Sequence, residues 1–264
     1  MKSIILSSAA LIFSALPFQA TLSQSDEDKG LEIATATNQR DSGWKHVIAD
    51  MEMILKNRAG KESRRKISFR QLEVDGDGDK SLSLFLEPRD VTGTAMLTFS
   101  HGLEPDDQWL YLPAIKRVKR ISSKNKSGPF MGSEFAFEDL GSQEIEKFAY
   151  KFLGEEACGE SFECYVIERL PQYENSGYKR QISWIDKEHY RTMKIEYYDR
   201  KNSLLKTLDF IGYNEYPGNY WRADRFEMVN HQTGKSTSLL WTNYDFDSEL
   251  DDSDFNQKAL KRLL

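Results

Sequence analysis

The residues best suited to chemistry are the acidic run Asp75-Gly76-Asp77-Gly78-Asp79 and four histidines. Aspartates alternating with glycine match the start of an EF-hand calcium loop, which would require glycine at position 80 and an acidic residue at position 86. Lys80 and Leu86 stand there, so the run predicts an acidic turn between two strands. The four histidines are His46, His101, His189 and His231, and no two of them have the spacing of HExxH or a comparable metal-binding motif. We therefore expect that the protein holds no metal and no cofactor.

Catalytic side chains form no recognisable motif either. The GxSxG pattern of many serine hydrolases is absent. Carboxylates are numerous, as on any acidic surface, and no pair of them is singled out for acid–base chemistry. We therefore expect a protein that is not an enzyme, and an enzyme acting on lipid-linked substrates ranks third among our hypotheses.

The two cysteines, Cys158 and Cys164, have five residues between them, and each borders a strand-like run. In an oxidising compartment they would bridge a hairpin, and the alternative is two free thiols. We expect the disulfide, because export is indicated by the N-terminus and no metal-type partner pair accompanies the cysteines.

The N-terminus has the layout of a secretory signal. Lys2 precedes an apolar run of thirteen residues from Ile4 to Leu16, which is too short to span a bilayer. Ala20 and Ser23 are both suitable last residues of the leader, so cleavage is expected between residues 20 and 25. No cysteine near this point would allow lipid attachment. We predict a signal peptide over residues 1–23, followed by a periplasmic protein that is not lipidated.

The composition is that of a globular chain with a substantial β content. Of its 264 residues, 39% are hydrophobic, 30% are charged and 12% are aromatic. The formal net charge of −6 becomes about −7 without the leader, and an acidic chain is poorly suited to nucleic-acid binding. No linker or internal repeat divides the chain, so residues 24–264 are predicted to form a single domain.

The apolar pattern from Trp44 onward has a period of two, which is typical of strands with one apolar face. About eleven strands follow at hairpin spacing. Helical patterns cover Asp26–Arg40 and the C-terminus, where Asp254 resembles the N-cap of a helix ending at Leu264. A sheet of this length must curl to hide its apolar face. The pattern predicts a mainly β fold with few helices, in which a curled antiparallel sheet encloses a groove.

Apolar and aromatic side chains in the first strands are the candidates for lining this groove. The sequence pattern alone favours a filled core, and the alternative is a cavity for an acyl chain, in which flexible methionines suit variable ligands. Periodicity alone does not separate the two readings. The candidates are Val47, Met51, Met53, Leu55, Ile67, Phe69, Leu82, Leu84, Leu86, Leu97, Phe99, Trp109 and Tyr111.

Two further features lie between the strand pattern of Trp109 and that of Glu146. Phe130 and Met131 are flanked by glycines, and they either pin a loop to the body or form a mobile apolar gate over the groove. A basic strand is either a solvated face or a site for anionic lipid headgroups or an acidic partner surface. Its charged residues are Lys116, Arg117, Lys119 and Arg120.

The central stretch resembles the periplasmic LolA-like family of outer-membrane lipoprotein-sorting proteins. The segments that carry the resemblance are Asp107-Gln108-Trp109-Leu110-Tyr111-Leu112-Pro113, Lys116-Arg117-Val118, Met131-Gly132-Ser133 and Glu138-Asp139-Leu140. Further along the chain the likeness continues through Trp184-Ile185-Asp186-Lys187, Lys194-Ile195-Glu196-Tyr197-Tyr198-Asp199, Leu205-Lys206-Thr207-Leu208 and Arg225-Phe226-Glu227-Met228.

This resemblance implies a half-open β-barrel with a helical lid over an apolar cavity, as in the carrier LolA and its receptor LolB. It also implies binding of a lipid or an acylated protein, together with an inner-membrane RND-type (MMPL) exporter and an outer-membrane acceptor. We expect a monomer that acts as a carrier. The alternative is a periplasmic sensor that uses the same groove to detect mislocalised lipids or lipoproteins.

Overall fold

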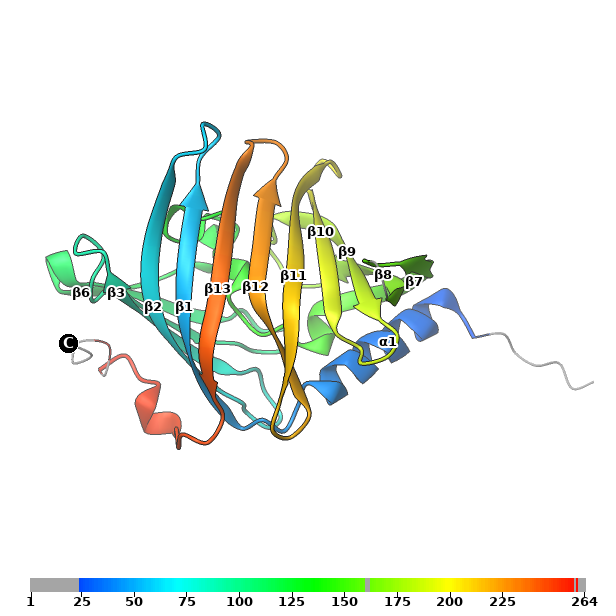
Figure 1. Cartoon of the computed structure of the whole chain (residues 1–264), viewed down its shortest axis with the longest axis horizontal. Coiled ribbons are helices and arrows are strands. Elements are labelled where there is room, and N and C mark those ends of the chain that lie inside the picture. The colour runs from blue at the N-terminus through cyan, green and yellow to red at the C-terminus, as the bar shows by residue number, and fades with distance from the viewer. Residues whose placement is uncertain (1–23, 160–161, 259, 261–264) are drawn as a thin grey trace, which may run out of the picture.

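The computed structural model describes residues 24–159, 162–258 and 260, which form one antiparallel sheet of thirteen strands and one α-helix (Figure 1). The helix is α1 (Asp26–Arg40). The strands are β1 (His46–Lys56), β2 (Glu62–Leu72), β3 (Lys80–Glu87), β4 (Ala95–Phe99), β5 (Asp107–Leu112), β6 (Arg117–Arg120), β7 (Phe148–Ala157), β8 (Glu163–Pro171), β9 (Tyr178–Asp186), β10 (Thr192–Asp199), β11 (Leu204–Tyr216), β12 (Tyr220–Asn230) and β13 (Lys235–Asp245).

Strands that follow one another in the sequence pair with each other, except for β6 and β7. The sheet order is β6-β5-β4-β3-β2-β1-β13-β12-β11-β10-β9-β8-β7, so β1 and β13 meet at its centre. The two edges, β6 and β7, are not hydrogen-bonded to each other. The sheet curves strongly without closing (Figure 1), which confirms the predicted half-open, curled antiparallel fold.

Alternation along β1 shows why this sequence forms the centre of the sheet. Val47, Ala49, Met51 and Met53 are buried on the concave face. Asp50 between them is exposed, as expected for a strand with one apolar face. Because cross-strand partners share a face, the pairing of Met51 with Ile67 extends the apolar concave surface into β2.

The helix α1 begins at a typical cap. The Ser25 hydroxyl accepts a hydrogen bond from the Asp28 backbone N–H at 3.0 Å, and Asp26, Glu27 and Asp28 place negative charge in the first turn. The helix lies across the lower part of the sheet in Figure 1 and packs on β7. Gly30 allows this approach, since a Cβ there would lie 2.8 Å from the Lys151 backbone.

The segment between β6 and β7 folds into short 3-10 turns. These are η2 (Ser123–Asn125), η3 (Phe130–Gly132), η4 (Phe137–Asp139) and η5 (Ile145–Lys147); η1 (Pro113–Ile115) precedes β6. Phe130 and Phe135 from this segment are buried in the same cluster as Met53 and Phe85. The segment therefore fills part of the concave side of the sheet.

The C-terminal chain covers part of the opposite, convex face. Phe255 and Leu260 pack with Leu82, Leu97 and other residues of β3 to β5. These three strands are therefore apolar on both faces, because each face is covered by a different part of the chain.

Two details of the predicted elements change. The sheet has thirteen strands among the described residues, where about eleven were expected, and the predicted basic strand is present as β6. The helix at Asp26–Arg40 is confirmed. The C-terminal helix from Asp254 is not found in the part that is described: Asp251 caps the 3-10 turn η6 (Asp252–Asp254) instead.

The predicted signal peptide lies outside the described residues. Among those described, no helix is both long and apolar enough to cross a membrane.

Candidate functional site: a ligand cavity

A cavity of about 780 Å³ lies on the concave side of the sheet, next to α1. Its walls come from the C-terminal half of α1, the β2–β3 loop, the residues before β7, and strands β1, β2 and β7 to β13. The space beside it is occupied by the η3 and η4 turns. The cavity is therefore the part of the concave side that remains open.

Aromatic rings form much of the wall next to the sheet centre. Trp241 of β13 has Phe69 at 5.1 Å and Phe226 at 5.6 Å between ring centroids, and Phe226 lies 4.8 Å from Phe210. Tyr244 continues this row at 6.1 Å from Trp241. All five line the cavity. Such a surface suits an apolar ligand, because large rings bury much area at little cost in conformational entropy.

Three polar atoms in the wall are buried and have no hydrogen-bond partner among the described residues: Arg169 Nε, Ser183 Oγ and Trp241 Nε1. All three residues line the cavity. Ser183 is 2% exposed and Trp241 is 9% exposed. Buried polar groups are almost always paired, because leaving one unpaired costs roughly 1–3 kcal/mol. Their gathering around one cavity therefore marks it as a place for a polar ligand group.

Arg169 is held in position but lacks a counter-ion. Its Nη2 donates to the Gln181 carboxamide oxygen, and its guanidinium carbon lies 4.8 Å from the Phe148 ring centroid. None of the ion pairs between described residues includes Arg169.

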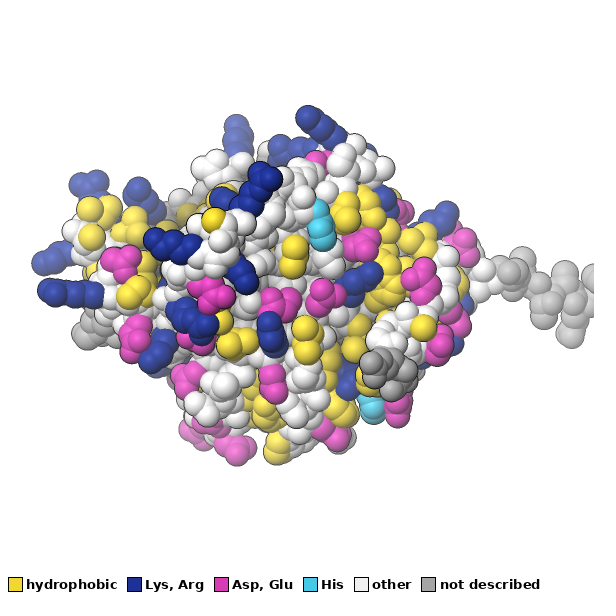
Figure 2. Space-filling model, turned by 45° about the horizontal axis from the view of Figure 1, so that its top comes forward, with side chains coloured by type: hydrophobic (Ala, Val, Ile, Leu, Met, Phe, Trp, Pro, Cys, Tyr) yellow, Lys and Arg dark blue, Asp and Glu magenta, His cyan; other side chains and the backbone are white. Residues whose placement is uncertain are grey.

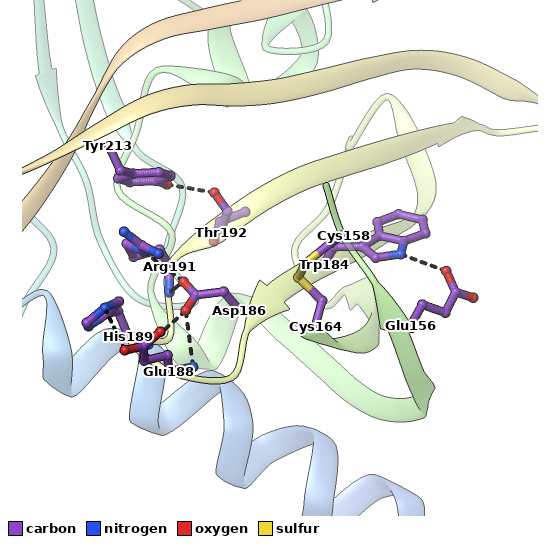
Figure 3. Close-up of a disulfide and its surroundings, with 10 residues drawn as sticks. All are labelled: Glu156, Cys158, Cys164, Trp184, Asp186, Glu188, His189, Arg191, Thr192 and Tyr213. Carbon is purple, nitrogen blue, oxygen red and sulfur yellow. Dashed lines mark hydrogen bonds and ion pairs between the residues drawn. A yellow bond between two sulfur atoms is a disulfide. The ribbon is translucent and has the colours of Figure 1, made fainter. Parts of the chain in front are cut away.

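Two other arginines of the cavity wall, Arg191 and Arg222, form ion pairs with carboxylates. Arg191 is 9% exposed, and its Nε donates to Asp186 at 2.8 Å (Figure 3). Burial alone would raise the pKa of Asp186, but hydrogen bonds from Arg191 and from the His189 backbone hold it below its usual value. The same carboxylate accepts the backbone N–H of Glu188 at 3.1 Å. Asp186 thus fixes the β9–β10 turn, which presents His189 and Arg191 to the cavity.

Part of the cavity wall is acidic. The β2–β3 loop contributes Glu73, Asp75, Asp77 and Asp79, and Glu144 and Glu146 lie before β7. Burial, reinforced by the charge of Glu144, raises the pKa of Asp79 to about 7. Its carboxyl group is therefore partly protonated at neutral pH. The run at residues 75–79 is a turn between strands, as predicted.

The cavity candidates predicted from sequence divide between the two faces of the sheet. Val47 and Phe69 line the cavity. Met51, Met53, Leu55 and Ile67 lie on the same concave side, within the main core cluster.

The remaining candidates belong to the convex face, so placing them in the groove is wrong. Register decides this, since Leu82 pairs with Leu97, and Leu97 pairs with Trp109. These residues pack under the C-terminal chain together with Leu84, Phe99 and Tyr111. Leu86 is exposed.

Phe130 is 1% exposed and packs against Phe85 and Phe137, while the Met131 carbonyl accepts a hydrogen bond from Arg65 at 2.6 Å. Both residues are thus held against the sheet and do not line the cavity. Cys158 and Cys164 form a disulfide at the β7–β8 turn (Figure 3).

The basic patch lies at the sheet edge on β6, away from the cavity, where Figure 2 shows Lys and Arg side chains protruding. Lys116, Arg117, Lys119 and Arg120 are all exposed there, and Arg120 pairs with Asp107.

Sequence reasoning missed Arg169 and Ser183. The available signal was the placement of polar residues at inward-facing positions of otherwise apolar strands. Ser183 shares the inward face of β9 with Ile185, and its cross-strand partners are Ile167 and Ile195. Arg169 lies two residues beyond Ile167 on the same face of β8.

Comparison with known proteins places the chain in a family. A family model described as "Uncharacterized protein" matches residues 77–262. The crystal structure of a Vibrio parahaemolyticus domain assigned as an outer membrane lipoprotein-sorting protein shares 56% sequence identity, covers 89% of this chain and all of that domain, and has a TM-score of 0.88. The chain belongs to the LolA-like family.

Two further structures agree with this assignment. A DUF1329 family protein from Desulfovibrio piger shares 31% identity with this LolA-like chain, with a TM-score of 0.85 over 90% of this chain and 100% of that one. A LolA superfamily protein from Nitrosomonas europaea, at 17% identity and a TM-score of 0.70 over 87% and 98% of the chains, shows the fold alone. No curated protein sequence matches the chain.

Proposed function

We propose that this LolA-like protein is a periplasmic carrier that shields the apolar chain of a lipid or an acylated protein. The observation that carries the proposal is the open, aromatic-walled cavity of about 780 Å³ beside an otherwise filled concave face. Ligand sites typically measure roughly 300–1,000 Å³ and combine apolar walls with a few polar groups. The cavity combines both features.

The energetics of chain burial are adequate for such a carrier. Each methylene group removed from water contributes roughly 0.8 kcal/mol, so a sixteen-carbon chain gains on the order of 10 kcal/mol before the costs of binding. For a carrier to release the ligand to a second membrane, the acceptor there must bind the chain with a similar free energy. An inner-membrane RND-type (MMPL) exporter as donor and an outer-membrane acceptor would complete the route.

Three features support the periplasmic location. The N-terminal sequence has the layout of an export signal. The Cys158–Cys164 disulfide fits an oxidising compartment. The Vibrio parahaemolyticus relative is itself assigned as an outer membrane lipoprotein-sorting domain.

A bulky side chain introduced on α1 would block the cavity and so tests the proposal. Thr37 lines the cavity, whereas Thr35 on the same helix does not. We expect Thr37→Trp to weaken uptake of a fluorescent phosphatidylethanolamine at least tenfold, with Thr35→Trp as the matched control. Equal uptake by native protein, Thr37→Trp and Thr35→Trp would show that the cavity does not hold the chain.

Native mass spectrometry of protein purified from a periplasmic extract identifies the ligand class. A carrier should contain a lipid or acylated peptide and release it to acceptor vesicles. A sensor with the same ligand should instead change its affinity for a regulatory protein and leave the vesicles empty. A protein that purifies empty and takes up no probe would refute lipid binding altogether.

A further inference from the structure

The polar end of the cavity is defined by two neighbouring side chains on β8 and β9. Arg169 pairs with Gln181 across these strands, and Ile167 pairs with Ser183. Arg169 and Ser183 are therefore diagonal neighbours on one face, a relation that places Cβ atoms within about 8 Å. Both line the cavity, and both have a buried polar atom without a partner, Nε in one and Oγ in the other.

Building on the carrier function proposed above, we infer that Arg169 and Ser183 form a subsite for an oxyanion at the end of the ligand's apolar chain. A carboxylate or a phosphate group accepts hydrogen bonds at several oxygen atoms, which matches two donors facing one space. Hydrogen bonds from arginine to such oxyanions are among the strongest in proteins. The ligand class is thus an acidic amphiphile.

The setting of Arg169 supports an anion rather than a neutral polar group. The Arg169 side chain is half-buried and its Nε is fully buried, and a charge withdrawn from water is normally paired, because it loses hydration without compensation. Gln181, which accepts from Nη2, is neutral and orients the guanidinium without cancelling its charge. The ligand would supply the missing negative charge.

The other charges of the cavity leave this subsite as the place for an anion. Arg191 and Arg222 are each already paired, with Asp186 and Asp41. Arg40 also lines the cavity, but it is exposed at the end of α1, where water weakens its attraction for an anion. The acidic part of the wall would repel an oxyanion, because it carries four carboxyl groups on the β2–β3 loop together with Glu144 and Glu146 before β7. Trp241 Nε1 is also unpaired, but it belongs to β13, four strands further along the sheet than β9, so it is a separate donor.

The experiment compares three ligands with the same chain: dodecanoate, dodecyl phosphate and methyl dodecanoate. Each displaces a neutral naphthylamine probe from the mature protein at pH 8. We expect the native protein to bind at least one of the two acids at least tenfold more tightly than the ester. The stronger acid identifies the headgroup as carboxylate or phosphate.

Arg169→Met keeps the length of the side chain and removes the charge, so it should abolish this preference while changing the affinity for the ester less than twofold. Ser183→Ala should weaken acid binding severalfold and leave ester binding unchanged. Arg89→Met removes the same charge from the exposed β3–β4 turn and should have no effect. Melting curves establish that each variant is folded, and Ser183→Ala gives an independent test if Arg169→Met does not fold.

Equal binding of acid and ester by the native protein would overturn the oxyanion subsite and leave the carrier proposal intact. The subsite is also overturned if Arg169→Met or Ser183→Ala weakens acid and ester binding to the same extent. Failure of the native protein to bind any of the three ligands would overturn both proposals.

Discussion

The buried ion pair that anchors the η4 turn is expected to dominate the stability of the internal segment. Lys206 of β11 donates from Nζ to Asp139 Oδ2 at 2.7 Å and to the Glu134 carbonyl at 2.9 Å. The two paired side chains are only 4% and 6% exposed. Replacing Lys206 by Met keeps the length of the chain and leaves the Asp139 carboxylate buried without a cation.

Removing one partner of a buried ion pair typically costs about 3–5 kcal/mol. Asp139 keeps two donors, the Tyr178 hydroxyl at 2.8 Å and the Ala136 backbone N–H at 2.6 Å. We therefore expect the lower end, a loss of about 3 kcal/mol in the free energy of unfolding. Urea denaturation measures this, and the midpoint should fall by about 1 M with an unchanged m-value.

Lys66→Met is the matched control. The Lys66–Glu87 pair is 61% exposed on both sides, so its loss should cost less than about 0.5 kcal/mol. A Lys206→Met variant that loses less than about 1 kcal/mol would refute the reasoning, because the ion pair would then be solvated. The double variant Lys206→Met/Asp139→Asn should be more stable than the sum of the single losses predicts.

Two further changes follow from the same structure. Because the pKa of Asp79 is raised to about 7 in the folded state, its contribution to stability is fully present below about pH 4 and is lost as the pH rises through 7. Asp79→Asn should therefore flatten this part of the pH–stability curve and stabilise the protein at pH 8 by on the order of 2 kcal/mol in urea denaturation; a native curve already flat between pH 4 and 8 would contradict the assignment. Gly30→Ala gains about 1 kcal/mol of helix propensity but places a Cβ 2.8 Å from the Lys151 backbone, so we expect a lower melting temperature and a displaced α1. A higher melting temperature for Gly30→Ala would mean that α1 packs on β7 more loosely than described.

Local features of the fold were predictable from the sequence because they depend on short-range patterns. The bounds of α1 follow from its acidic first turn and the break after Arg40. The strand at His46–Lys56 follows from alternation of Val47, Ala49, Met51 and Met53. The curled, open sheet follows from the number of such strands, and the resemblance to the LolA-like family agreed with it.

The sequence pattern could not show which residues lie on the concave face of the sheet and which lie on the convex face. The stretch Leu82 to Leu86 has buried apolar side chains on both faces, because η3 covers one face at Phe85 and the C-terminal chain covers the other at Leu82. Alternation shows that a strand has two faces but not which part of the chain covers each of them. The groove candidates on β3 to β5 were misplaced for this reason.

The polar end of the cavity was missed for a different physical reason. A single arginine at an inward position, such as Arg169, looks like any surface arginine until the pairing of β8 with β9 is known. The same holds for Lys206, whose partner Asp139 lies 67 residues away in the sequence. Contacts of this kind depend on the tertiary fold, and no local pattern encodes them.

The pairing of β1 with β13 at the centre of the sheet constrains the order in which the molecule can fold. Met51 pairs with Trp241, 190 residues later, whereas every other strand meets partners nearby in the sequence. During synthesis or translocation, the edge of β1 would remain unpaired until the last strand emerged, and such edges promote aggregation. Chains that end before β13 would therefore lack both the seam and the Trp241 wall of the cavity. We expect such truncated chains to need protection by a chaperone and to bind no ligand.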